Sequence, residues 1–183
     1  LQSEFDFENE TYDASIGSNP EYDTDILRYN YTSLTTPYSV IDLNVVTQKE
    51  EIKKQQEILG GDFDSKNYTS ERLFATAHDG KKIPISLVRH VDTQFNKNTP
   101  ILQYGYGSYG STIDPSFSSV RLSLLDRGFV FAIAHIRGSQ YLGRSWYEDG
   151  RMLYKKNTFK DFVSSSKFLI ENNYTSKDHL YAE

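Results

Sequence analysis

Residues 101–110 read Ile-Leu-Gln-Tyr-Gly-Tyr-Gly-Ser-Tyr-Gly, and this stretch decides the fold class of the chain. The segment from Ile101 to Tyr104 suits a buried strand, and a loop with three glycines follows it directly. A strand that runs into a glycine-rich loop is a common place for a ligand or reacting group in an α/β fold. The glycines allow tight turns, but Tyr106 and Tyr109 between them are bulky. The sequence therefore predicts an α/β domain with its functional loop at this position.

Helical and extended patterns alternate after this loop. Asp114 resembles a helix N-cap with proline at the first helical position, and Gly128 suits the position just past the helix end. The apolar run Phe129–Ala134 is typical of a parallel strand that is covered on both faces. Residues 158–171 carry a helical stripe that opens on a capping-box pattern, and residues 179–183 suit the start of a strand. Residues 137–151 read as a loop. This order predicts the first half of a mostly parallel sheet with flanking helices.

The residues before this stretch predict further strands. Ser70–Ala77 and Lys82–Arg89 flank an Asp-Gly turn, which favours a hairpin. Earlier strands are predicted at residues 26–33 and 38–43, and residues 52–58 suit either a third strand or, by their charges, a helix. Two or three such strands resemble one blade of a repeated sheet, whereas residues 1–25 are acidic without clear periodicity. The turn-rich residues 60–67 suggest a boundary, so we divide the chain into residues 1–66 and 67–183.

Composition excludes several classes of function. The 183 residues carry a net charge of −5 without a basic stripe, which argues against nucleic-acid binding. Because the chain has no cysteine, disulfide scaffolds, thiolate zinc sites and thiol nucleophiles are ruled out. No apolar run is long enough to span a bilayer, and the four histidines lack the spacing of a metal pair. We therefore expect no metal, no cofactor and no membrane partner.

Two chemistries remain to be weighed at the loop. Gly105, Gly107 and Gly110 match the G-x-G-x-x-G dinucleotide pattern, and Arg137 after the next strand could hold an NADP 2′-phosphate. Residues 111–115 separate the glycines from a helix, which weakens that match. A serine hydrolase needs a G-x-S-x-G elbow, which is absent, and Ser108 has the wrong spacing. A non-catalytic interaction fragment is the third alternative.

Several ordered motifs carry a family resemblance. They are residues 104–110, residues 121–128, His135-Ile136-Arg137-Gly138, residues 146–150 and residues 156–161. Together they resemble the prolyl oligopeptidase family of serine peptidases, and the last two narrow the resemblance to its oligopeptidase B branch. The resemblance runs from about residue 28 to residue 183 and is dense from His78 onward.

This resemblance implies a cytoplasmic serine oligopeptidase that hydrolyses short peptides after Lys or Arg. Residues 67–183 would be the first half of an α/β-hydrolase domain, and residues 1–66 the end of a β-propeller with its linker. The serine elbow would follow Glu183, with the Asp and His of the triad further on. We therefore expect this chain to be a fragment that is inactive by itself.

The resemblance transfers two site residues to this chain. Tyr106 matches a tyrosine whose hydroxyl donates a hydrogen bond in the oxyanion hole, a role that a protonated phenol can fill. Asp114 matches the first of two acidic residues that bind a basic side chain one position further from the cut. The family has Asp where this chain has Ser116, and Gly-Gly-Glu where it has residues 139–141. Both departures change the expected charge near the substrate.

Overall fold

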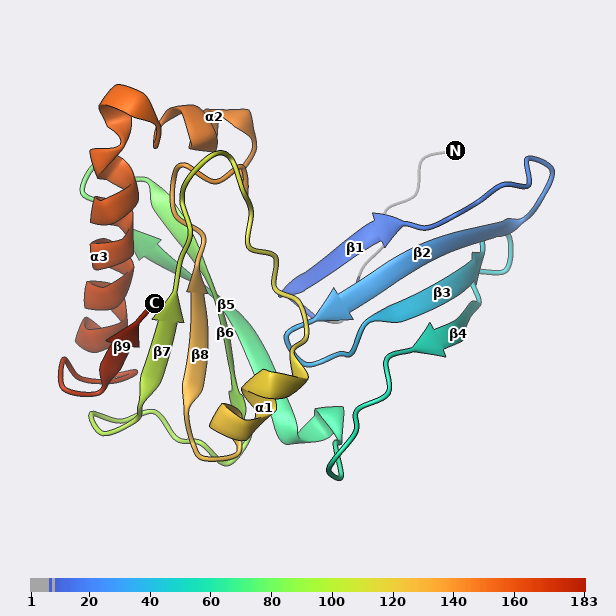
Figure 1. Cartoon of the computed structure of the whole chain (residues 1–183), viewed down its shortest axis with the longest axis horizontal. Coiled ribbons are helices and arrows are strands. Elements are labelled where there is room, and N and C mark those ends of the chain that lie inside the picture. Colours follow the sequence, from blue (N-terminus) through green and yellow to red (C-terminus); the bar gives the residue numbers. More distant parts are fainter. Residues whose placement is uncertain (1–6, 8) are drawn as a thin grey trace.

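The computed structural model describes residue 7 and residues 9–183, and it contains two separate sheets (Figure 1). The first sheet is an antiparallel meander of β1 (Tyr12–Ile16), β2 (Ile26–Ser33), β3 (Ser39–Asn44) and β4 (Glu50–Gln55). The strands β2 and β3 confirm the predictions at residues 26–33 and 38–43, and β4 shows that the third segment, which suited a strand or a helix, is a strand. The strand β1 was missed because four of its five residues are exposed, so apolar alternation is lacking. Residues 1–6 and 8 of the predicted 1–66 unit lie outside the described residues.

The second sheet follows a turn of 3₁₀-helix, η1 (Ser65–Asn67). Its strands are β5 (Tyr68–Thr76), β6 (Lys82–His90), β7 (Ile101–Tyr104), β8 (Val130–Ala134) and β9 (Leu180–Ala182), in the spatial order β5-β6-β8-β7-β9. β7 pairs in parallel with β8 and β9, whereas β6 pairs antiparallel with β5 and β8. The described sheet is therefore mixed rather than mostly parallel, because the β5–β6 hairpin supplies two antiparallel pairings.

Helices follow the parallel strands. They are α1 (Ser119–Leu125), α2 (Arg144–Glu148), the 3₁₀ turn η2 (Met152–Tyr154) and α3 (Lys156–Glu171). The prediction that Asp114 caps α1 is wrong, because the helix begins at Ser119 with Ser118 as its N-cap residue. The predicted capping box at Thr158 is also wrong, since α3 starts two residues earlier and Thr158 lies inside it. The predicted loop 137–151 contains α2.

The two longer helices cover opposite faces of the second sheet, as Figure 1 shows. Alternate strand residues point to opposite faces, so one strand contributes to both layers. Ile85 and Leu87 of β6 pack in the same core as Leu169 of α3. Val88 of the same strand packs with Leu125 of α1. The buried β8 is covered in this way on both faces, which confirms the interpretation of its apolar run.

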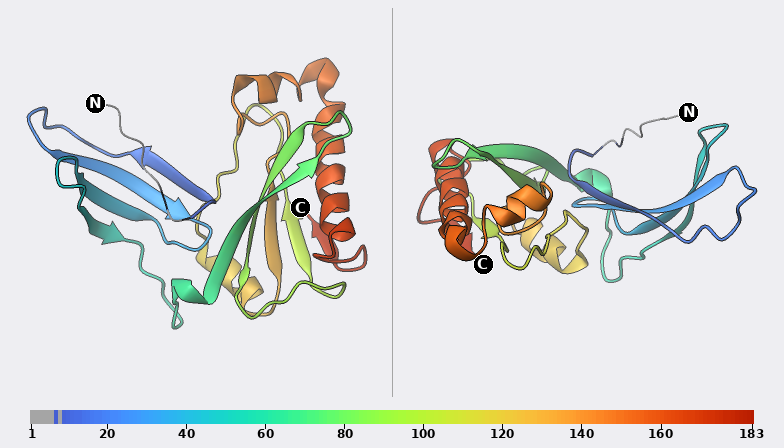
Figure 2. Two further views of the ribbon diagram at one scale, coloured as in Figure 1. Left: turned by 180° about the vertical axis from the view of Figure 1, so that it is seen from behind. Right: turned by 90° about the horizontal axis from the view of Figure 1, so that it is seen from above.

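The first sheet extends away from the second, and Figure 2 shows them as two wings. Residues 56–64 connect the last strand of one to η1 of the other. Leu34, just after β2, packs in a buried cluster with Leu125 of α1 and Ile133 of β8. The Phe117 backbone N–H donates to Thr32 Oγ1 of β2 at 3.1 Å. The segment between the glycine-rich loop and α1 therefore contacts the first sheet.

Candidate functional site: the glycine-rich loop after β7

The glycine-rich loop leaves the carboxyl end of β7 and lies against the chain after β8. A Cβ atom on Gly107 would lie 2.5 Å from the Arg137 carbonyl oxygen and equally close to Thr158 Cγ2. A Cβ atom on Gly138 would clash with the Gly107 carbonyl, and Gly138 has φ +95°. The Gly110 N–H donates to the Gly138 carbonyl at 3.0 Å. These glycines are needed because two backbone segments approach each other closely.

The first turn of α3 holds this contact from the other side. The Thr158 hydroxyl lies 2.8 Å from the Arg137 carbonyl oxygen and 3.0 Å from that of Gly150. The Lys155 ammonium donates to the Gly107 carbonyl and, at 2.8 Å, to Ser108 Oγ. Thr158 is buried. Side chains at the start of α3 thus hold the backbone at Gly107, between Tyr106 and Ser108.

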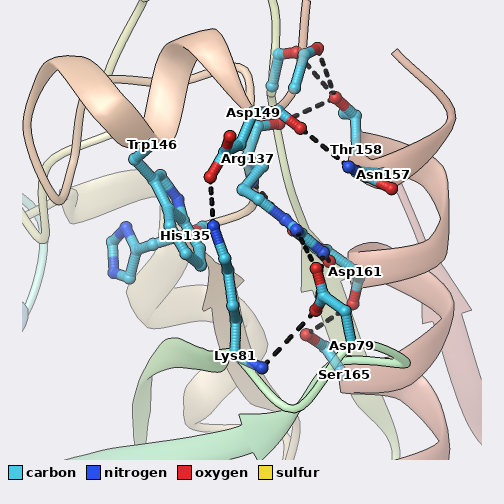
Figure 3. Close-up of polar contacts among 12 residues, drawn as sticks. Asp79, Lys81, His135, Arg137, Trp146, Asp149, Asn157, Thr158, Asp161 and Ser165 are labelled. Atoms are coloured by element: carbon cyan, nitrogen blue, oxygen red, sulfur yellow. Dashed lines mark hydrogen bonds and ion pairs between the residues drawn. The ribbon is translucent and has the colours of Figure 1, made fainter. Parts of the chain in front are cut away.

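A buried cluster of charges lies beneath the loop (Figure 3). Arg137 donates to Asp161 from Nε at 2.7 Å and from Nη2 at 2.5 Å, and its backbone N–H donates to the same carboxylate at 3.1 Å. Its Nη1 donates to Asp79 in the β5–β6 turn at 2.6 Å. Arg137 is 1% exposed and Asp161 is fully buried. We call Arg137, Asp161 and Asp79 the arginine clamp, because they join β8, α3 and the β5–β6 hairpin.

The electrostatics of the arginine clamp agree with a permanent ion pair. Hydrogen bonding to Asp161 raises the pKa of Arg137, and Asp79 adds to this effect against the cost of burial. Hydrogen bonding to Arg137 lowers the pKa of Asp79, in opposition to the effect of burial. A buried cation needs partners of this kind, because an unpaired charge is strongly disfavoured in a protein interior. The cluster therefore stabilises the site and has no free charge to offer a ligand.

The residues that suggested dinucleotide binding are not available to a ligand in this structure. Arg137 is buried and paired, so it cannot meet a 2′-phosphate. The loop glycines contact their own chain, and α1 begins only at Ser119, so no helix N-terminus faces the loop directly. A pyrophosphate site needs both features.

The two predicted site residues lie at different ends of the segment between β7 and α1. The Tyr106 side chain is 40% exposed, and its hydroxyl has no hydrogen-bond partner within residues 7 and 9–183. Asp114 is exposed near the first sheet, where partial burial and the neighbouring Asp13 raise its pKa. Within the described residues no hydrogen bond or ion pair joins Tyr106 and Asp114, and both side chains are exposed to solvent.

One serine–histidine pair has the distance of a nucleophile and its base. Ser86 Oγ lies 2.6 Å from His135 Nε2. Ser86 is fully buried and His135 nearly so, and the imidazole stacks on Tyr141 with ring centroids 3.6 Å apart. Burial lowers the pKa of His135 to about 3. Because neither side chain can reach a substrate, we assign this pair to the core.

Sequence reasoning missed the residues that support the loop. Thr158 and Asp161 were noted only within the motif at residues 156–161 and were interpreted as a helix capping box, and Lys155 was given no role at the loop. Arg137 was considered only as a phosphate ligand. The sequence signal that could have identified them is a row of polar residues on the helix face that packs on the sheet. Thr158, Asp161 and Ser165 recur at helical spacing on one face of α3, where apolar residues would be expected.

In the described part of the chain, no helix is long and apolar enough to cross a membrane. No group of three or more His, Asp or Glu side chains there is placed to hold a metal ion.

Comparisons with known proteins identify relatives over nearly the whole chain. Residues 115–183 match the model of the prolyl oligopeptidase family. Dipeptidyl aminopeptidase BI from Pseudoxanthomonas mexicana is 46% identical over 172 residues, which cover 93% of this chain and 24% of that protein. Protease 2 from Moraxella lacunata is 40% identical over 171 residues, which cover 93% of this chain and 25% of that protein. The chain thus spans about a quarter of the length of the curated relatives it matches.

Solved structures give the same result. Oligopeptidase B from Leishmania major matches with a TM-score of 0.85 and 41% identity, over 96% of this chain and 25% of that one. The antipain-bound oligopeptidase B from Trypanosoma brucei matches with a TM-score of 0.86 and 40% identity, over 97% of this chain and 25% of that one. These matches confirm the resemblance predicted from the motifs, and the mixed α/β content is shared with these structures.

Proposed function

We propose that this chain, which resembles the prolyl oligopeptidase family and within it oligopeptidase B, is part of a serine oligopeptidase that cleaves short peptides after Lys or Arg. The observation that carries the proposal is the 40–41% identity to two oligopeptidase B structures over at least 96% of the chain. The relatives' names support peptide hydrolysis in general. The basic preference is our extension from the oligopeptidase B branch to this chain.

The proposed domain assignment follows the two sheets. We assign residues 67–183 to the first half of an α/β-hydrolase domain and residues 1–66 to the end of a β-propeller with its linker. Helices on opposite faces of a sheet with parallel strands at β8-β7-β9 support the first assignment. A four-stranded antiparallel meander supports the second, since propeller blades have this form.

Tyr106 is the proposed oxyanion donor. Tyr106 is 40% exposed and its hydroxyl has no hydrogen-bond partner in the described residues, while the backbone that follows it is fixed through Gly107. A donor held in place before the reaction stabilises developing negative charge more effectively than one that must reorganise. The arginine clamp and Lys155 would therefore act as positioning residues for this hydroxyl.

Asp114 is the proposed contact for a basic side chain at the second position from the cut. Asp114 is exposed and its carboxylate makes no hydrogen bond within the described residues, and its pKa is raised by partial burial and by Asp13. A bound cation would relieve both effects. Because α1 begins at Ser119, Asp114 does not cap the helix, and its side chain is available for this contact.

The triad itself is proposed to lie outside these 183 residues. The sequence contains no G-x-S-x-G, Ser108 is bonded to Lys155 rather than to a histidine, and the Ser86–His135 pair is buried. Covalent catalysis needs a nucleophile within reach of both its base and the substrate.

The proposal is tested by comparing this chain with the complete protein. We expect the complete protein to react with a fluorophosphonate serine probe and to cleave peptides after Lys or Arg, and this chain alone to do neither. Labelling of the chain alone would contradict the absence of a nucleophile. A complete protein that is labelled but cleaves after other residues would reject the basic preference and leave the serine peptidase class intact.

A further inference from the structure

A small pocket lies on the side of the glycine-rich loop that faces α2 and η2. It has a volume of about 230 Å³. The residues that matter for its chemistry are Ser108, Tyr109, Tyr147, Arg151, Met152 and Lys155. Neither Tyr106 nor Asp114 lines it. The pocket is smaller than sites that enclose whole drug-sized ligands, so its size suits a single amino-acid residue.

The polar part of the pocket is cationic. Lys155 is half-buried, and within the described residues no carboxylate lies within ion-pair distance of its ammonium group. Arg151 pairs through Nε with Glu148 at 2.5 Å, but Glu148 is shared with Arg144 at 2.6 Å. None of the residues that line the pocket is acidic. The pocket therefore attracts a negatively charged group that has a compact, hydrogen-bonding shape.

The rim of the pocket is apolar and exposed. Tyr109 is 86% exposed and Met152 is 79% exposed, although both are large side chains. Two guanidinium groups lie over the Tyr147 ring, that of Arg144 at 5.0 Å and that of Arg151 at 5.2 Å from its centroid. A ligand with a carboxylate and an adjoining apolar group would satisfy both parts of the pocket.

We propose that this pocket binds the C-terminal residue of a short peptide substrate, with the carboxylate toward Lys155 and Arg151 and the side chain against Tyr109 and Met152. The inference rests on the proposed peptidase function. Asp114 lies at the end of the segment that contacts the first sheet, whereas the pocket lies at the end that contacts α2 and α3. In a peptide whose residues before the cut lie near Asp114, the residues after the cut would reach the pocket. Recognition of a terminal carboxylate there would favour peptides that end soon after the cut.

The test uses the complete protein and three peptides that differ at one end. They are acetyl-Ala-Arg-Ala-Leu as the free acid, the same peptide as the carboxamide, and an amidated version with Glu in place of Leu. We expect kcat/KM to be about tenfold higher for the free acid than for the carboxamide, as is typical of a charge-assisted hydrogen bond in a partly buried site. The amidated Glu peptide should be cleaved no faster than the Leu carboxamide.

Two variants separate the pocket from general effects of charge. Arg151→Gln should reduce the preference for the free acid to within about twofold, mainly through KM, because one of two cations is lost. Arg144→Gln is the matched control, since Arg144 pairs with the same glutamate and stacks on the same ring but does not line the pocket. It should keep the full preference.

Three results would overturn the inference: equal kcat/KM for acid and carboxamide, a preference that survives Arg151→Gln, or a preference for the amidated Glu peptide. If the complete protein cleaves none of the peptides, the proposed function fails separately. Calorimetric binding of the dipeptide Ala-Leu against its amide then tests the pocket without catalysis, and equal affinity would reject it.

Discussion

Arg137 and Asp161 form a buried ion pair with two side-chain hydrogen bonds, from Arg137 Nε at 2.7 Å and from Nη2 at 2.5 Å. The same arginine contacts the glycine-rich loop through its backbone, since its carbonyl oxygen faces Gly107 and accepts a hydrogen bond from Thr158. One residue therefore links the stability of the domain to the shape of the loop that carries Tyr106.

The first prediction concerns this pair. Asp161→Asn removes the charge that compensates Arg137 and leaves a buried cation with only Asp79. We expect a loss of about 3 kcal/mol in the free energy of unfolding, as is common when one partner of a buried pair is removed. Urea denaturation measures it. The exposed pair of Lys53 and Glu51 offers the control Glu51→Gln, which should leave the transition midpoint unchanged. A loss below about 1 kcal/mol for Asp161→Asn would contradict a structural role for the clamp.

The second prediction concerns the close approach at Gly107. A methyl group at this position meets the Arg137 carbonyl oxygen, which is backbone and cannot rotate away. Gly107→Ala should therefore destabilise the chain by about 1–3 kcal/mol, the usual cost of overpacking. The control is Gly61→Ala, where the added methyl has no neighbour within 4 Å. Equal melting temperatures for the two variants would show that the two segments are not held together in solution.

The third prediction is a pH dependence from His135. Burial first, and Arg72 second, lower its pKa to about 3. In the unfolded chain the pKa is about 6.5, so between these values the unfolded state binds the proton more readily. Stability should therefore fall as the pH is lowered from about 6.5 toward 3. Between pH 7 and pH 5, wild type should lose about 2 kcal/mol more than His135→Gln, which has no such proton to bind.

Measuring the free energy of unfolding at both pH values tests this directly. The carboxylates titrate in wild type and variant alike, so only the difference between them reports on His135. His78 lies exposed in a turn, and His78→Gln should therefore keep the wild-type loss. Parallel pH profiles for wild type and His135→Gln would mean that the imidazole is accessible to protons in the folded chain.

The fourth prediction concerns the basic preference in the complete protein. Asp114→Asn should lower kcat/KM by about two- to fivefold for peptides with Lys or Arg at the second position from the cut, because an exposed pair contributes little. Peptides with Ala there should be unaffected. Ser116→Asp restores the acidic residue of the family pattern and should raise the preference by a similar factor.

The melting temperature of Asp114→Asn should equal that of wild type, since Ser118 rather than Asp114 precedes α1. Equal losses on basic and Ala peptides would remove Asp114 from substrate binding.

The sequence predicted the elements whose patterns are strong and local. The apolar run of β8 and the Asp-Gly turn between β5 and β6 needed no tertiary information. Helix starts were less predictable, because Asp114-Pro115 has the composition of a cap, whereas the helix begins at Ser119 and the Phe117 backbone bonds to the first sheet instead. The exposed edge strand β1 has no apolar alternation, so its pairing with β2 decides its structure.

The site was predictable only in part, for a similar reason. Tyr106 and the loop glycines are adjacent in sequence, so the strand followed by glycines was enough to place them in one loop. The arginine clamp joins residues 58 and 24 positions apart, Asp79 and Asp161 on either side of Arg137. Local patterns interpret each of the three as a turn, a cap or a ligand. Only the fold brings the three residues together. Their burial then makes the ion pairs important for stability, because an unpaired charge is costly in the interior.

The most direct test of the account is the effect of Tyr106→Phe on kcat in the complete protein. If the hydroxyl binds the oxyanion, its removal should lower kcat by about a hundredfold or more and leave KM nearly unchanged, because the interaction belongs to the transition state. Tyr154→Phe is the matched control, since Tyr154 is a 64% exposed tyrosine of η2 that belongs neither to the glycine-rich loop nor to the lining of the pocket, and it should keep kcat within about twofold of wild type. Melting curves for both variants establish that the loop is intact. A Tyr106→Phe variant with the kcat and melting temperature of wild type would contradict the assignment of this loop as the oxyanion site.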